Sequence, residues 1–94
     1  MSATDISIPL ELDHDVNEWS ENDVELFLMA NMKRYRLMNQ DIQAVKLQRV
    51  SGFNLLDLTG ADFGRCGLPV GPANTIVQLV NKLKVTKGLG MPGK

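Results

Sequence analysis

Residues that commonly carry catalysis or bind metals are scarce in this chain. Its 94 residues include one cysteine, Cys66, and one histidine, His14. A disulfide needs two cysteines, and a structural zinc site needs about four cysteine or histidine ligands, so one chain can build neither. We likewise expect no nucleophilic Cys–His pair, no bound metal and no cofactor.

Two carboxylates, Asp57 and Asp62, could be considered as a general acid and a general base. Thr59 stands three positions before Asp62, however, and this spacing is typical of a cap at the start of a helix. No glycine-rich phosphate loop, nucleophile elbow or metal cluster accompanies the two carboxylates. The sequence therefore predicts no enzyme and no small-molecule substrate.

Charge is distributed unevenly along the chain. The first 25 residues hold eight of the 11 acidic residues and no lysine or arginine, so all ten basic residues follow them. A cluster of these basic residues could contact the phosphates of RNA or of an anionic membrane. Its only adjacent aromatic residue, Tyr35, offers little surface on which bases could stack. We keep RNA or lipid binding as the alternative to a mixed, solvated surface. The group comprises Lys33, Arg34 and Arg36, with Lys46 and Arg49 as further candidates.

The composition also bears on where the protein resides. One unpaired thiol is ordinary in a reducing compartment. No apolar run approaches the roughly 20 residues of a membrane helix, and the first residues lack the basic and then apolar layout of a signal peptide. We expect a soluble protein in the cytoplasm, and the nucleus is also compatible.

Both ends of the chain differ from its middle. Residues 1–15 are acidic and alternate polar with apolar residues, but no partner strand follows, so we predict a flexible or loosely docked leader. Residues 88–94 are rich in glycine and proline and are expected to form a flexible tail. The folded domain should span residues 16–87.

Two helix starts carry the same sequence signature. Ser20 with Asp23, and Thr59 with Asp62, have the spacing of capping boxes. Each is flanked by a pair of apolar residues that could form a hydrophobic staple. The pairs are Trp19 with Val24, and Leu58 with Phe63. The first helix continues through Phe27, Leu28 and Met32, and the other is short and stops at Gly67.

Three further helices complete the expected fold. One begins at Asn39 with Met38, Ile42 and Val45 on its inner face, and a buried turn follows over residues 53–58. The longest spans about residues 72–85, opens at Gly71 and Pro72, and carries an apolar stripe. The stripe consists of Ile76, Leu79, Val80 and Leu83. The sequence thus predicts an all-α protein with five helices.

In their order and spacing, these features resemble the sterile alpha motif (SAM) domain. The resemblance covers nearly the whole of residues 16–87 and implies a compact five-helix bundle with a long C-terminal helix. The matching residues are Trp19, Ser20, Asp23, Val24, Phe27, Leu28, Tyr35, Val50, Ser51, Gly52, Leu55, Leu56, Leu58, Thr59, Asp62, Phe63, Cys66, Gly67, Leu68, Gly71, Ile76, Leu79 and Leu83.

The resemblance implies a module that binds other SAM domains, its own copies or different ones, in signalling or regulatory scaffolds. Family members usually associate through two surfaces. The resemblance places an end-helix surface at Leu68, Val70, Gly71, Asn74 and Thr75, and a mid-loop surface at Asn54, Asp57 and Asp62.

The start of the fifth helix departs from the family pattern. Many SAM domains have a basic residue just after the opening glycine, whereas residues 72–75 of this chain are uncharged. This weakens the electrostatic part of the expected contact. It argues against strong self-polymerisation and against RNA binding at this helix start.

Overall fold

This computed structural model describes residues 6–88 of the chain, which contain seven helical segments. Two are short 3-10 helices and five are α-helices, and no strand occurs among these residues. The predicted all-α fold with five α-helices and a long final helix is confirmed. The segments are η1 (Leu10–Leu12), η2 (Val16–Glu18), α1 (Glu21–Asn31), α2 (Asn39–Leu47), α3 (Gly52–Leu55), α4 (Gly60–Arg65) and α5 (Val70–Thr86).

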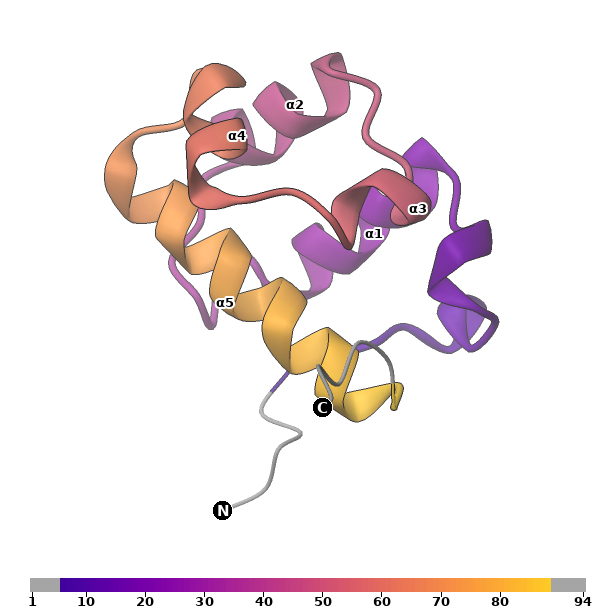
Figure 1. Ribbon diagram of the computed structural model, residues 1–94. Coiled ribbons are helices and arrows are strands. Elements are labelled where there is room, and N and C mark those ends of the chain that lie inside the picture. Colours follow the sequence, from indigo (N-terminus) through magenta and orange to yellow (C-terminus); the bar gives the residue numbers. More distant parts are fainter. Residues whose placement is uncertain (1–5, 89–94) are drawn as a thin grey trace.

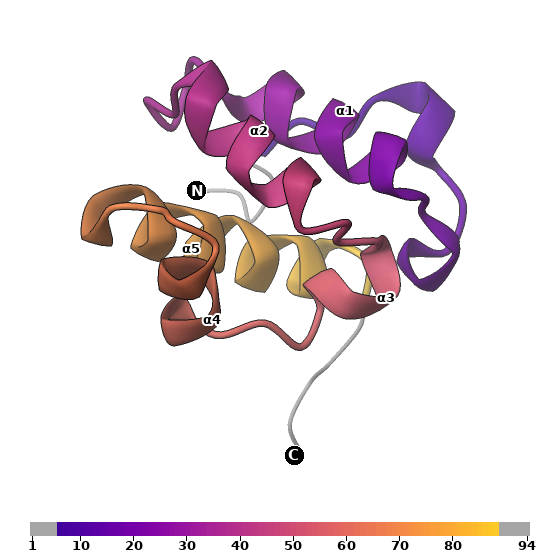
Figure 2. The same cartoon turned by 90° about the horizontal axis from the view of Figure 1, so that it is seen from above.

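The α-helices form two layers around one core. Helix α5 runs diagonally along the bundle (Figure 1). In Figure 2, α1 and α2 form the layer in the upper part of the picture, α4 and α5 form the layer in the lower part, and α3 lies at one end. Helix α1 packs on α2, α4 packs on α5, and α3 packs on η2 and α1. The largest fully buried side chains are Trp19, Phe27 and Phe63, and the rings of Trp19 and Phe27 lie 5.5 Å apart.

Both predicted capping boxes are present. The Ser20 hydroxyl accepts the backbone N–H of Asp23 at 3.1 Å, and the Asp23 carboxylate accepts the N–H of Ser20 at 3.0 Å. At α4, the corresponding bonds between Thr59 and Asp62 measure 3.2 and 2.9 Å. Each box satisfies backbone donors that have no acceptor within the helix, so both starts are fixed locally.

Helix α2 begins at Asn39 as predicted, but its inner face differs in one residue. Ile42 and Val45 are fully buried, whereas Met38 is 58% exposed. Met38 is the N-cap and has an extended backbone, so its side chain does not follow the register of the helix. The prediction that Met38 faces the core is wrong.

Helix α3 also presents a side chain that we expected to be buried. Leu55 has no exposed surface, but Phe53 is 62% exposed. Phe53 precedes Leu55 by two positions, which is about 200° around an α-helix, so a single turn that buries Leu55 turns Phe53 outward.

Gly52 marks the closest approach between α3 and η2. Its N–H donates to the carbonyl oxygen of Trp19 at 3.0 Å. A Cβ at this position would lie 2.7 Å from the Cβ of Trp19 and still closer to the carbonyl oxygen of Val16. Only glycine fits here, because any side chain would push the two segments apart.

Helix α5 begins at Val70, two residues before the predicted start, with Pro69 as its N-cap. Pro72 therefore occupies the third helical position. The N–H groups of the first helical turn have no acceptor within the helix, so a proline there removes no helical hydrogen bond.

Part of the expected leader is docked on the bundle. Ile6 and Leu12 are 7% and 0% exposed. The side-chain amide of Asn31, itself fully buried, accepts the N–H of Ser7 at 2.7 Å and donates to its carbonyl oxygen at 2.8 Å. Asn31 thus satisfies both backbone groups of one leader residue.

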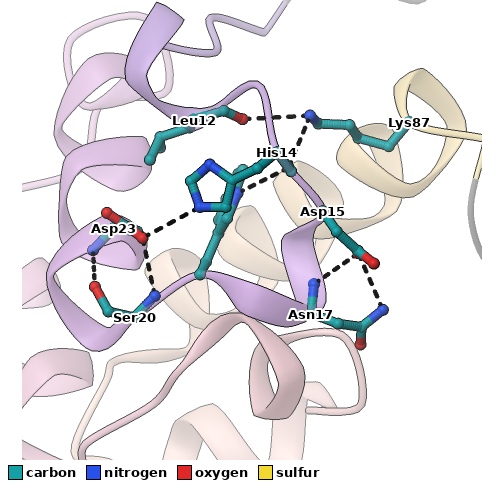
Figure 3. A network of polar contacts seen from close by, with 8 residues as sticks. Leu12, His14, Asp15, Asn17, Ser20, Asp23 and Lys87 are labelled. Atoms are coloured by element: carbon teal, nitrogen blue, oxygen red, sulfur yellow. Dashed lines mark hydrogen bonds and ion pairs between the residues drawn. The ribbon is translucent and has the colours of Figure 1, made fainter.

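A second set of contacts joins the leader to the end of α5 (Figure 3). The Lys87 ammonium group donates to the carbonyl oxygens of Leu12 and His14, both at 3.3 Å. The indole N–H of Trp19 donates to the same carbonyl of His14 at 3.3 Å. Residues 6–15 are therefore a packed part of the structure. Residues 1–5 of the predicted leader, and the predicted tail beyond Gly88, lie outside the described residues.

Candidate protein-interaction surfaces

The predicted end-helix surface lies at the start of α5. Val70, its first residue, is 82% exposed, and Gly71 and Asn74 are also exposed. Thr75 is half-buried. Leu68 is only 6% exposed and belongs to the core. Its side chain therefore packs inside the domain, beneath this surface, and does not contact a partner.

The backbone at this helix start is suited to an acidic or polar partner group. No side chain caps the helix, and its first turn contains no acidic residue. The first N–H groups of a helix lack intrahelical acceptors, and together they carry a partial positive charge. The start of α5 thus combines an exposed valine with hydrogen-bond donors.

The predicted mid-loop surface contains two side chains with different roles. The Asn54 amide oxygen accepts the Ser51 hydroxyl at 3.2 Å, so its orientation is fixed within the turn. Asp57 is exposed, and its carboxylate makes no hydrogen bond or ion pair with another residue among 6–88. Asp57 is the mid-loop acid that is available to a partner.

Asp62, the third predicted mid-loop residue, is already engaged. Its carboxylate accepts the Thr59 N–H and also pairs with the guanidinium of Arg65 at 2.7 Å. The hydrogen bonds from the backbone and then the side chain of Thr59 lower the pKa of Asp62. Its main role is to begin α4.

Two exposed apolar residues that precede this surface in the sequence were not predicted as contacts. Phe53 is 62% exposed in α3, and Leu47 is 79% exposed at the end of α2. Exposed aromatic and aliphatic side chains next to polar groups are common in interaction surfaces. The high density of apolar residues around Phe53 suggested burial, and only the position of the single helical turn shows that it faces outward.

Comparison with known proteins assigns this fold to a family. The family model of the SAM-like domain matches residues 1–82. The chain belongs to the SAM-like domain family. The match includes the docked leader as well as α1 to α4 and most of α5. No curated protein and no solved structure matches the chain.

Membership of the SAM-like family indicates a protein-interaction module, since such domains are generally non-catalytic. Within residues 6–88, no helix is long and apolar enough to cross a membrane. The same residues contain no group of three or more metal-ligating side chains.

The basic residues of this SAM-like domain do not gather at one place. Lys46 pairs with Glu25 at 2.8 Å and Arg49 pairs with Glu21 at 3.3 Å. The hydrogen bonds from Lys46 and then Gln43 lower the pKa of Glu25. Both glutamates lie in the first half of α1. The other three cations of the predicted basic group follow the end of this helix. These three, Lys33, Arg34 and Arg36, are exposed in the turn between α1 and α2, which we call the basic turn.

Tyr35 does not offer an open stacking platform beside the basic turn. It is half-buried, its hydroxyl lies 3.2 Å from the Lys82 ammonium group, and that ammonium group lies 5.4 Å from the ring centroid. The ring is thus held against α5, which removes an element that single-stranded RNA recognition requires.

Cys66 and His14, the remaining side chains that could react, have the surroundings of structural residues. Burial raises the pKa of the Cys66 thiol, and the charge of Asp62 raises it further, so the thiol is not activated as a nucleophile. The His14 ring lies 3.6 Å from the Asp23 carboxylate (Figure 3).

Proposed function

We propose that this SAM-like domain mediates SAM–SAM association, with its own copy or with a different SAM domain, within a signalling or regulatory scaffold. The main support is the start of α5, where Val70 is 82% exposed at an uncapped helix end. A partner would bury the Val70 side chain and accept hydrogen bonds from the backbone N–H groups at the start of α5.

The mid-loop side offers the complementary chemistry. Leu47 and Phe53 supply exposed apolar surface, and Asp57 supplies a free carboxylate. A carboxylate at a helix N-terminus contributes about 0.3–1 kcal/mol, so Asp57 would mainly orient a copy against the start of α5.

Apolar burial has to supply most of the affinity. Full burial of one such side chain contributes about 1.5–3 kcal/mol, so Leu47, Phe53 and Val70 together contribute about 4.5–9 kcal/mol. Association costs an estimated 4–15 kcal/mol in lost freedom of motion. The contact should therefore be weak, and it should depend little on salt because the first turn of α5 is uncharged.

Two different surfaces that meet head to tail form open chains unless one of them is blocked. Given the weak contact, we propose short oligomers or mixed pairs. We place the domain in the cytoplasm or nucleus, in keeping with the unpaired thiol of Cys66.

The alternative, binding of RNA or anionic lipid through Lys33, Arg34 and Arg36, has less support. Lys46 and Arg49 are paired elsewhere, and Tyr35 is held by Lys82. If it operates, binding falls steeply with salt and is lost when the three cations are reversed to glutamate.

A mixing experiment tests the proposed association. The Val70→Asp variant blocks the start of α5, and the Phe53→Asp variant blocks the mid-loop side. At high salt, which weakens contacts between opposite charges, each variant alone should stay monomeric in sedimentation equilibrium, whereas an equimolar mixture should form one-to-one pairs through the two intact surfaces. A mixture that stays monomeric while the wild type associates would contradict this use of the two surfaces.

A further inference from the structure

The charges of the domain are separated along α1. Glu21, Asp23 and Glu25 lie in the first half of the helix, and the basic turn follows its end. Residues 26–40 contain no acidic residue. The docked leader adds three acids to the negative end, namely Glu11, Asp13 and Asp15, and η2 adds Glu18, all of them exposed.

Each charged end also exposes apolar side chains. Leu10 is 90% exposed next to Glu11 in η1. Met29 and Met38, which flank the basic turn in sequence, are 45% and 58% exposed. The two ends are thus opposite in charge and both partly apolar, as expected of surfaces that bind each other.

The backbone of the basic turn is unfavourable for the residue it carries. Arg36 has a φ of 59°, in the left-handed region that favours glycine. Residues with a side chain rarely adopt this conformation. Arg49, which has the same φ, uses its charge in an ion pair with Glu21, and we expect a comparable partner for the exposed Arg36.

Within one chain, η1 and the basic turn lie on different sides of the fold. In both views η1 and η2 lie on one side of the molecule and the turn between α1 and α2 lies on the other (Figures 1 and 2). A second copy can present its leader to the basic turn without any change of fold.

We propose that the basic turn, with Met29 and Met38, binds the acidic leader end of a second copy, formed by Leu10, Glu11 and Asp13. This contact rests on the proposed association function but uses residues other than the start of α5 and the mid-loop side. Because it depends on opposite charges, it weakens as salt rises, whereas the contact through Val70 does not.

Charge exchange between two variants tests the contact. The turn variant carries Lys33→Glu and Arg36→Asp, where aspartate tolerates the left-handed backbone better than glutamate does. The leader variant carries Glu11→Lys and Asp13→Lys. A control variant carries Arg49→Asp and Lys84→Glu, which give the same charge change as the turn variant, and Arg49 has the same φ of 59°.

Sedimentation equilibrium at low salt, with all chains in the Val70→Asp background, isolates this contact. Chains without other changes should associate, and their association constant should fall by at least about tenfold at high salt. The turn and leader variants should each be monomeric alone and should associate when mixed, and the control should associate at least as strongly as its parent, because Arg49→Asp removes a cation from the acidic end.

Three results would overturn the proposal. One is a mixture that stays monomeric while the parent chain associates. Another is a turn variant that loses thermal stability but keeps its association constant, since the cations would then only stabilise the end of α1. The third is a parent chain that is monomeric at low salt, whether or not it binds RNA or anionic vesicles. None of these results bears on the contact through Val70, which is tested separately.

Discussion

The Asp62 carboxylate accepts the backbone N–H of Thr59 at 2.9 Å, and the Thr59 hydroxyl accepts the N–H of Asp62 at 3.2 Å. These reciprocal bonds begin α4. Asp57 lies in the same region but has no such structural role. The sequence assigns both acids to one predicted surface, but only Asp62 also begins a helix.

Charge reversal should separate these functions. We expect Asp57→Lys to weaken SAM-type association and to leave the thermal unfolding midpoint unchanged, because its carboxylate makes no hydrogen bond or ion pair with the other residues among 6–88. Asp62→Lys should lower both quantities, since it also removes the cap of α4. Sedimentation equilibrium and circular dichroism melting measure the two effects. If both variants keep wild-type association while Asn74→Lys abolishes it, only the end-helix side is used.

Acid should destabilise the domain partly through Asp62. Hydrogen bonds from Thr59 hold the folded-state pKa of Asp62 below its ordinary value of 3.8. This stabilisation is therefore complete above that ordinary value and is lost as the pH falls through the folded-state pKa. Urea unfolding across the acid range should show a smaller loss of stability for Asp62→Asn than for the wild type. Equal pH dependence in the two proteins would show that the cap does not perturb Asp62.

A glycine pair tests the packing of α3 against η2. Gly52→Ala should lower the free energy of unfolding by about 1–3 kcal/mol, because its Cβ collides with backbone that cannot move freely. Gly64→Ala in α4 is the matched control, with no atom within 4 Å of the new Cβ, and it should stabilise by up to about 1 kcal/mol. Chemical denaturation compares the two. Similar losses for both would show that the close approach at Gly52 is not tight.

Removal of one buried amide should release the leader. Asn31→Ala leaves the N–H and carbonyl of Ser7 without their partners, which should cost about 1–3 kcal/mol. Hydrogen exchange should then quicken at residues 6–12, while the amides of α5 between Ile76 and Leu83 stay protected relative to them. Uniformly faster exchange over the whole chain would mean that the leader does not open separately.

Local signals in the sequence predicted much of the fold. The boxes at Ser20 and Thr59 are set by residues three positions apart, so their bonds follow from short-range geometry. The apolar stripe of α5 likewise required burial on one face, and Ile76, Leu79, Val80 and Leu83 are at most 2% exposed.

The rest depends on contacts between distant residues. The sequence left open whether the leader is flexible or loosely docked, because its partners, Asn31 and Lys87, lie 24 and 75 positions away from the residues they bind. Leu68 was expected at the surface because its burial depends on how α4 meets α5. The outward position of Phe53 depends on how a single turn sits against η2, which periodicity cannot resolve over four residues.

Solution mass as a function of concentration tests the central claim, that the start of α5 is a protein-binding surface. The wild type should show a weight-average mass that rises above the monomer at high concentration, at high salt, where contacts between opposite charges are weakened. Val70→Asp should remain monomeric, and Val85→Asp, which changes an exposed valine near the other end of α5, should match the wild type. A wild-type mass that stays at the monomer value throughout, in a domain that also retains no protein from a lysate, would contradict the account.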